Sequence, residues 1–329
     1  MNNIDFVIPW VNSDDETWLR KKNNYSSSEN SKKIENGSKS ERFRDYGTLK
    51  FLIRSIDKFA PWVHKVFIVT DNQIPDWLNT KHSKIEVIDH SKIFPNQLLP
   101  NFNSNAIEFE FDKISGLSNN FVTFNDDFLI IKPVKPEDFF VRNTPKDFRI
   151  YTSLLPLDTF DKIQFNNALA INGWLNDKWP LNKHGLFSLK YGKTQIHNAI
   201  QLLTNRHVSN YVISHNAISF NKSSYVKAKK IWPNLIENTI SHKFRTSNDV
   251  SIWLIRYLQL ETGNFEMRSP SFSKYYRLNE ISEILNELSL PKHYLICIND
   301  SDTKKYKEVT KKLVNKLEKS FPEKSKFEL

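Results

Sequence analysis

Residues 121–127 read Phe-Val-Thr-Phe-Asn-Asp-Asp, a short apolar run that ends in three polar side chains. A run of this length and composition is typical of a buried strand. Residues 4–12, 66–73 and 294–300 repeat the pattern, and the polar end of each of these runs contains Asn or Asp. Open α/β sheets bind ligands beyond the carboxyl ends of their strands. The pattern therefore predicts one shared polar crevice, and with it an enzyme.

Helical and strand-like segments alternate around this stretch. Residues 45–59 carry apolar side chains at a period of 3.6 and end before Pro61, which predicts a helix. Strands are expected at 66–70 and 85–88. Further helices are predicted at 104–117, 249–260 and 303–320, and further strands at 121–124, 128–131 and 294–298. The β-α-β order favours a parallel sheet.

The size and composition fit one large domain or two ordinary ones. The chain has 329 residues, of which 39% are hydrophobic. It has no apolar run near the roughly 20 residues of a membrane-spanning helix, and no basic-then-apolar start, so we expect no signal peptide. The single cysteine, Cys297, falls inside a predicted strand and is expected to be a buried structural thiol. These features predict a cytoplasmic protein.

The charge narrows the choice of partner. The chain carries 47 Lys and Arg against 37 Asp and Glu, a net charge of +10. This balance indicates either a solvated lysine-rich surface or a polyanionic partner, such as a nucleotide, a phosphosugar, an acidic glycan or an anionic membrane. The absence of zinc-finger and RNP-type motifs argues against nucleic acid. The sequence also lacks GxGxxG and GxxxxGK[ST], which argues against a dinucleotide fold and a P-loop enzyme.

Asp126 and Asp127 are the strongest local candidates for chemistry. Adjacent carboxylates at a strand end can hold Mg²⁺ or Mn²⁺, with nucleotide phosphates completing the coordination. One of the two could instead act as a general base. The structural alternative is a turn, which Asn and Asp favour.

The other candidates each have a structural alternative. His215 could transfer protons or fill a structural position, and Arg245 could grip phosphate or be a surface arginine. His242 and Arg245 belong to a basic segment before the predicted helix 249–260, where a helix N-terminus would favour an anion. The remaining candidates are Trp10, for stacking on a base or filling the core; Asn12 and Asn72, at strand ends; Glu108, as an active-site or solvated acid; and Asn299 and Asp300, as a further wall of the site or a hairpin turn.

Residues 23–40 are rich in Ser, Asn, Lys and Glu and show no periodicity. This composition predicts a mobile loop. The loop could be a lid over the crevice or a plain surface insertion.

Four blocks of the sequence carry a resemblance to a known family. The first is residues 4–12, Ile-Asp-Phe-Val-Ile-Pro-Trp-Val-Asn. The second begins at 42–45, Arg-Phe-Arg-Asp, and continues through 54–56, 60–63, 68–70, 73–78, 106–108, 116–118 and 125–127. A looser third block lies around His215 and 242–245, and a fourth at 297–300. In this order the blocks resemble the Stealth family of sugar-1-phosphate transferases. That family includes bacterial capsular polysaccharide phosphotransferases and the catalytic subunit of the lysosomal-enzyme N-acetylglucosamine-1-phosphotransferase.

The resemblance implies a reaction at phosphorus. An acceptor hydroxyl of a bacterial surface glycan would attack the β-phosphate of a UDP-hexose or UDP-N-acetylhexosamine such as UDP-GlcNAc, and UMP would leave. Asp126 and Asp127 would then ligate the metal or supply the base, His215 would transfer the proton, and Arg245 would clamp the phosphates. Glu108 and Asp300 would be secondary candidates. Trp10, Asn12 and Asn72 would lie near the nucleotide.

The expected architecture is a single α/β catalytic domain with a mostly parallel, Rossmann-like sheet of the glycosyltransferase-A type. Residues 1–140 and 291–302 would form its core, and 141–290 a mainly helical insertion that binds acceptor and phosphate. The basic helix at 303–329 could touch the inner face of an anionic membrane, or simply be solvated. The acceptor could be lipid-linked or free. Two rival functions remain at this point: a metal-dependent glycosyltransferase that releases UDP, and a non-catalytic module that binds polyanions.

Overall fold

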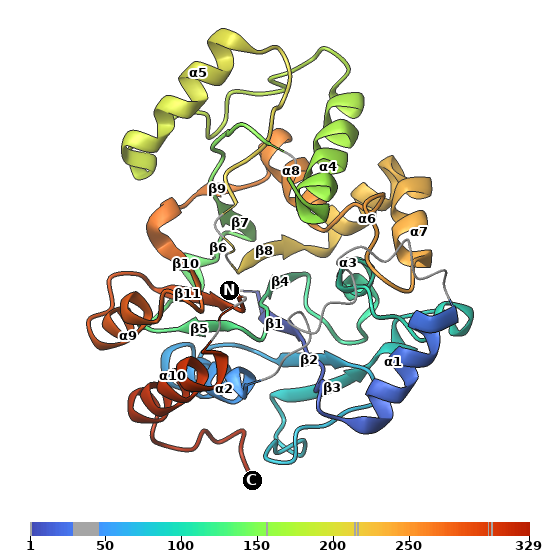
Figure 1. The fold of residues 1–329 in the computed structure, drawn as a ribbon. Coiled ribbons are helices and arrows are strands. Elements are labelled where there is room, and N and C mark those ends of the chain that lie inside the picture. The colour runs from blue at the N-terminus through green and yellow to red at the C-terminus, as the bar shows by residue number, and fades with distance from the viewer. Residues whose placement is uncertain are drawn as a thin grey trace.

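A five-stranded sheet forms the centre of the computed structural model, which describes residues 2–28, 46–155, 157–213, 215, 217–301, 303 and 305–329 (Figure 1). Its order is β3-β2-β1-β4-β8, with bounds Ile85–Asp89, Val66–Thr70, Ile4–Pro9, Asn120–Thr123 and Ile218–Asn221. The first four strands run parallel and β8 is antiparallel to β4. The predicted α/β class with a mostly parallel sheet is confirmed.

Alternating side chains of the strands build a separate core on each face of this sheet. Phe6 and Ile8 of β1 face α2 (Thr48–Phe59), whose Leu49, Leu52 and Ile56 are fully buried against them. Val7 points to the other face, where α3 (Ser104–Phe109) and the helices of the insertion pack. Both faces are covered, as parallel sheets require.

A second sheet brings the C-terminal part of the chain to the centre of the fold. Its order is β10-β11-β5, with bounds Ser273–Arg277, Leu295–Asn299 and Phe128–Ile130. The helices α9 (Ile281–Ser289) and α10 (Tyr306–Ser320) contribute Ile284, Leu313 and Leu317 to the core under this sheet. Because β11 pairs with β5, the strand that follows Asp127, two predicted site segments meet here.

The rest of the chain forms a helical part above the main sheet (Figure 1). Its helices are α4 (Thr159–Leu175), α5 (Ile196–Thr204), α6 (Lys222–Ile231), α7 (Pro233–Ser241) and α8 (Trp253–Glu261), and its small sheet joins β6 (Phe140–Val141), β7 (Thr144–Asp147) and β9 (Glu266–Met267). Buried Arg149 pairs with Glu261 at 2.7 Å and anchors this part. Contrary to the predicted boundary, residues 141–290 also supply β8 and β10 to the two larger sheets.

Three predicted elements differ in extent. The helix expected at 104–117 ends at Phe109 and is followed by a single 3₁₀ turn at Phe111–Lys113. The helix expected at 249–260 begins only at Trp253, because Asp249 uses its carboxylate to bind His242 and Thr246. The predicted loop at 23–40 is wrong at its start, since α1 spans Glu16–Ser28; its remainder, 29–40, lies outside the described residues.

Candidate active site

The carboxyl ends of four neighbouring strands create the candidate site. The register pairs Val7 of β1 with Thr123 of β4 and Pro9 with Val69 of β2, so the segments that follow these strands share one edge of the sheet. At about 4.8 Å per strand, the edge from β4 to β3 spans roughly 14 Å. An extended, charged ligand of nucleotide-sugar size fits that span.

Asp127 is held against β11 by backbone and side-chain contacts. Its backbone carbonyl accepts from Ile298 N at 2.9 Å, which fixes the Asn-Asp-Asp turn against β11. Its Oδ2 accepts from Asn299 Nδ2 at 3.3 Å and from the Cys297 thiol at 3.5 Å. Cys297 is buried as predicted, yet it touches the site, which the sequence did not indicate.

The electrostatics of this corner favour a bound cation. Burial raises the pKa of Asp127 to about 6, and the hydrogen bonds from Asn299 and Cys297 oppose the rise. Burial, with the charges of Asp127, Asp300 and Asp126, also raises the pKa of the Tyr46 hydroxyl well above its usual value. The other Asp127 oxygen, Oδ1, is buried without a hydrogen-bond partner in the described structure. An unpaired buried carboxylate oxygen beside two more acids is costly unless a cation joins it.

The carboxylates fit a metal that shares its ligands with a substrate. Within the described residues, no three His, Cys, Asp or Glu side chains are grouped to hold an ion by themselves. Mg²⁺ in phosphate-handling sites is commonly held by one or two carboxylates, with phosphate oxygens and water completing the octahedron. Asp126 and Asp127 therefore suit an ion that arrives with a nucleotide.

His215 is connected to the residues around Asp127 through the side chain of Tyr275. Its ring stacks on Tyr275 with centroids 4.4 Å apart, and Tyr275 donates its hydroxyl to Asn299 Oδ1 at 3.4 Å. The ring of Phe160 also stacks on the imidazole, with centroids 5.9 Å apart. Burial lowers the pKa of His215 to about 4, so the imidazole is neutral at pH 7. Its backbone φ of 38° is unusual for a residue other than glycine, and such strain clusters at functional sites.

A pocket of about 320 Å³ lies at the ends of β2 and β3. It is lined by Lys21, Asp71, Asn72, Asp89, His90, Ser91, Leu99 and Pro100. Asn72 takes a left-handed conformation, φ 56°, and donates its backbone N–H to Asp89 at 2.6 Å. Among the described atoms, Asp71 Oδ2 and His90 Nδ1 are buried without partners. A nucleoside offers hydroxyl and ring groups that would satisfy both.

Several residues in or beside this pocket were not predicted. Lys21 binds Asp71 at 2.6 Å, and Gln73 accepts from Asn12 N at 2.8 Å and returns a hydrogen bond to Asn12 O. Asp71 and Gln73 stand beside Asn72 in the strand-end cluster, so the pattern that selected Asn72 could have selected them. Trp10 is 7% exposed and packs mainly in the core, the structural alternative for this residue.

The basic segment at 242–245 borders the same pocket. Lys243 donates Nζ to the carbonyl of Leu99, a pocket residue, at 2.7 Å. Arg245 donates to the hydroxyl of Ser104, and His242 is held by Asp249 at 2.6 Å. The expected role of a helix N-terminus here is wrong, because seven residues separate Arg245 from Trp253, where α8 begins.

Glu108 lies on α3, close to Arg245, rather than in solvent. Burial raises its pKa to about 7, and the positive charge of Arg245 opposes the rise. The structure thus gathers the predicted residues in two sets at one edge: Asp126, Asp127, His215, Asn299 and Asp300 around β4 and β11, and Asn12, Asn72, Glu108, His242 and Arg245 around β1, β2 and α3. Trp18, Phe102 and Phe244 cluster against Val11 and connect the second set to the end of β1.

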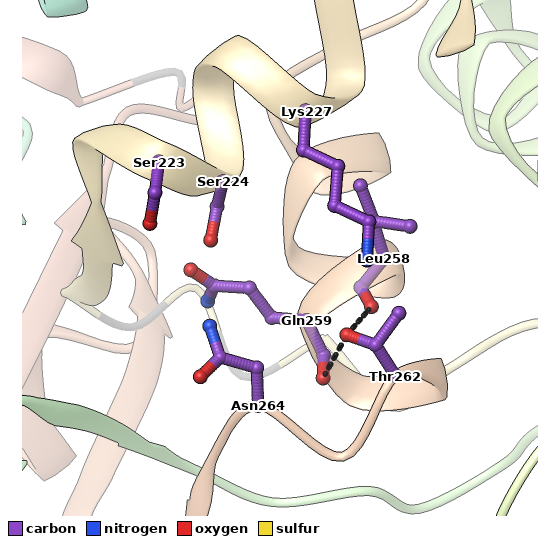
Figure 2. A pocket seen from close by; sticks show the side chains of 7 residues that line it. All are labelled: Ser223, Ser224, Lys227, Leu258, Gln259, Thr262 and Asn264. Atoms are coloured by element: carbon purple, nitrogen blue, oxygen red, sulfur yellow. Dashed lines mark hydrogen bonds between the residues drawn. The ribbon is translucent and has the colours of Figure 1, made fainter. Parts of the chain in front are cut away.

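Another polar pocket, of about 270 Å³, lies between α6 and α8. Ser223 and Ser224 point from the first turn of α6 toward Gln259 (Figure 2). Because β8 runs antiparallel to β4, this turn follows the end of β8 at the opposite edge of the sheet from Asp127. This pocket is therefore separate from the candidate active site.

Comparison with known proteins places the chain among polysaccharide phosphotransferases. Residues 42–148 match the model of Stealth protein CR2, conserved region 2. The chain is 40% identical over 330 residues to the exopolysaccharide phosphotransferase cps2G of Lactiplantibacillus plantarum, covering 99% of this chain and 96% of that protein. It is 37% identical to the capsular polysaccharide phosphotransferase WcwK of Streptococcus pneumoniae, covering 100% and 98%. The structure of the galactosyltransferase LgtC with donor and acceptor sugar analogues aligns with a TM-score of 0.39 at 9% identity, over 94% and 95% of the two chains.

Proposed function

This chain belongs to the Stealth family of polysaccharide phosphotransferases, and from that premise we propose that it transfers hexose-1-phosphate or N-acetylhexosamine-1-phosphate from a UDP-sugar to a surface glycan. The single observation that carries the proposal is the buried Asp127 carboxylate at the carboxyl edge of the sheet, one oxygen of which has no hydrogen-bond partner among the described residues. In the reaction, an acceptor oxygen bonds to the β-phosphorus and the bond from that phosphorus to the bridging oxygen breaks. UMP leaves with the bridging oxygen, and a phosphodiester remains.

The two sets of residues would bind different parts of the donor. The pocket beside Lys21, Asp71 and His90 would take the nucleoside, and Arg245 would grip phosphate oxygens from the α3 side. The roughly 14 Å edge then lets the sugar-phosphate reach Asp127. Holding the donor at both ends favours the in-line geometry that phosphoryl transfer requires.

His215 is our candidate for the acceptor proton. Its pKa of about 4 leaves the ring neutral at pH 7 and able to accept a proton. Stacking on the rings of Tyr275 and Phe160 restrains its orientation. The base could instead be one of the two aspartates, so the roles of Asp126 and Asp127 remain alternatives: metal ligand or base.

Mg²⁺ or Mn²⁺ at Asp126 and Asp127 would neutralise charge on the phosphate oxygens. Asn299 and Cys297 hold Asp127 Oδ2, so Oδ1 is the atom left to face the ion. Asp300 adds negative charge nearby, as its effect on Tyr46 shows.

The reaction is proposed for the cytoplasmic side of the cell membrane, where UDP-sugars are made and lipid-linked acceptors present their glycans. In the described part of the chain, no helix is both long and apolar enough to cross a bilayer. The proposed contact with the membrane is peripheral.

Product analysis tests the proposal. The protein is incubated with a panel of UDP-sugars, Mg²⁺ or Mn²⁺ and an oligosaccharide acceptor, and the released nucleotide is separated by chromatography. We expect UMP, formed only with acceptor and metal present. Release of UDP would indicate the rival glycosyltransferase, and salt-sensitive binding of the glycan without turnover would indicate a polyanion-binding module.

A further inference from the structure

The helix α5 has its polarity inverted relative to an ordinary surface helix. Its two buried side chains are polar, Asn198 and Gln201. Three of its apolar side chains face outward: Ile196 is 60% exposed, Ile200 52% and Leu203 87%, while Leu202 packs against the core. These three follow a spacing of four and three residues, which places them on one stripe of the helix.

The inward face is fixed by specific hydrogen bonds, so the exposure of the stripe is built into the fold. Asn198 accepts from Tyr151 N at 2.8 Å and donates to the carbonyls of Arg149 and Leu186. Gln201 accepts from the hydroxyl of Ser209 at 2.6 Å. Turning the helix over would leave these buried polar groups unpaired, at a large cost.

The segment before α5 adds more exposed apolar surface. Phe187 is 53% exposed and Leu189 97%. Isolated exposed apolar residues are ordinary, but a stripe joined to such neighbours marks a contact surface. Figure 1 shows α5 projecting from the helical part, at the opposite end of the molecule from α10.

The charge of this region indicates which kind of partner would bind to its exposed apolar surface. Residues 178–236 contain no Asp or Glu. The stretch around α5 carries basic residues only, namely Lys178, Lys183, Lys190, Lys193 and Arg206. Exposed apolar side chains flanked by cations suit the interface of an anionic bilayer, where each Lys or Arg near the surface adds to binding. A second copy of this face would bring like charges together, which disfavours self-association.

The basic C-terminal helix, the site predicted for membrane contact, lacks the matching apolar surface. Leu313 and Leu317 of α10 are fully buried against the second sheet. Its exposed side chains are mainly charged, among them Lys311 and Lys319. Without apolar insertion, charge alone gives a weaker and more salt-sensitive contact.

We propose that α5 and the segment 187–193 form a docking surface for anionic lipid. The inference rests on the proposed function in one respect: the surface would serve to hold the active site beside a lipid-linked acceptor. Binding itself requires neither donor nor acceptor.

The test is sedimentation of the full chain with vesicles of phosphatidylglycerol and phosphatidylcholine, compared with phosphatidylcholine alone. We expect binding to the anionic vesicles. The triple variant I196S/I200S/L203S and the double variant K190E/K193E should each lower the partition coefficient by about tenfold or more. These positions contact neither candidate half of the active site, so the variants should keep wild-type activity on a lipid-free acceptor.

Matched controls separate the alternatives. K311E/K319E changes the same charge on α10, and V226S removes an apolar side chain that is 46% exposed on α6; both should bind vesicles like the wild type. The proposal is overturned if the chain ignores anionic vesicles, if the α10 variant alone loses binding, or if sedimentation equilibrium shows a dimer that I196S/I200S/L203S dissolves. If the wild type binds the vesicles but shows no turnover, the proposed function is refuted and the docking surface is not.

Discussion

The buried carboxylate of Asp127 lowers the stability of the fold at neutral pH, and the proposed function explains why it is kept. Its pKa of about 6, against an ordinary value of 3.8, means that the folded protein binds the proton more tightly than the unfolded chain does. Stability from this group is therefore full below about pH 4 and is lost as the pH rises through 6. A buried carboxylate that weakens the fold at neutral pH is best explained by a ligand that needs it charged.

Asp127→Asn should lower transfer by about 10³-fold or more, because a neutral amide cannot replace the carboxylate as metal ligand or base. In EDTA at pH 7 the same variant should be more stable than the wild type, by on the order of 1 kcal/mol. Its free energy of unfolding should also lack the rise between pH 6 and pH 4. Turnover assays and urea titrations at several pH values measure both effects.

Asp177→Asn is the control for this substitution. Asp177 is exposed and has a φ of 64°, a conformation that Asn tolerates well. It should change neither turnover nor stability. Normal turnover in Asp127→Asn would remove Asp127 from the reaction.

Arg245→Gln should raise KM for the donor by about tenfold and lower kcat less, because a phosphate clamp acts in the ground state as well as in the transition state. It also removes the charge that opposes the rise in the pKa of Glu108, so that pKa should climb above about 7. Initial-rate kinetics report the first effect, and a carboxyl NMR titration the second. Arg206→Gln, at an exposed position, should leave KM unchanged; an equal rise in both variants would argue for general electrostatics.

At the scale of elements, the buried pair of Arg149 and Glu261 connects β-structure, helices and the aromatic core of the insertion. Glu261 accepts from Arg149 at 2.7 Å and from the hydroxyls of Tyr151 and Tyr211 at 2.8 and 2.6 Å. All four side chains are fully buried. The polar groups of such a buried network all have hydrogen-bond partners only when every member is present.

Glu261→Gln should therefore lower the free energy of unfolding by about 3 kcal/mol, since it strands a buried guanidinium. Chemical denaturation measures the loss. The exposed Glu237→Gln on α7 is the matched control and should change stability by less than about 0.5 kcal/mol. If the two variants were equally stable, the pair would not anchor the helical part.

Elements with strong local patterns could be predicted from the sequence. The strand Val66–Thr70 matches its prediction, since five consecutive buried positions leave little ambiguity. The helix Glu16–Ser28 was missed because its Lys, Asn and Ser residues give it a loop-like composition, and only a few side chains such as Trp18 pack inward. The break after Phe109 depends on tertiary packing, which periodicity alone cannot show.

The site was most directly predictable where it lies at strand ends. Asp127 and Asn299 were both selected, and the structure joins them at 3.3 Å. Lys21, on a helix, and Tyr275, on a strand beside β11, reach the site through long-range folding alone. Composition suggested the C-terminal helix for membrane contact, but burial of its apolar face could be seen only in three dimensions.

At the scale of the whole molecule, donor and metal should stabilise the fold together. A UDP-sugar with Mg²⁺ or Mn²⁺ should raise the melting temperature by a few degrees when both exceed their dissociation constants severalfold. Either one alone should do less, because phosphate and carboxylate oxygens share the ion. Differential scanning calorimetry measures the shift, and Asp127→Asn should abolish its metal-dependent part; an unchanged shift in that variant would place the metal elsewhere.

The central claim is attack at the β-phosphorus, and an oxygen label tests it directly. A UDP-sugar carrying ¹⁸O in the bond between the anomeric carbon and the β-phosphorus is incubated with the protein, metal and acceptor, and mass spectrometry follows the label. Transfer of sugar-1-phosphate leaves that carbon–oxygen bond intact, so the label should appear in the glycan phosphodiester and the released UMP should be unlabelled. Label found in released UDP, with no phosphorus in the glycan, would show attack at the anomeric carbon and contradict the claim.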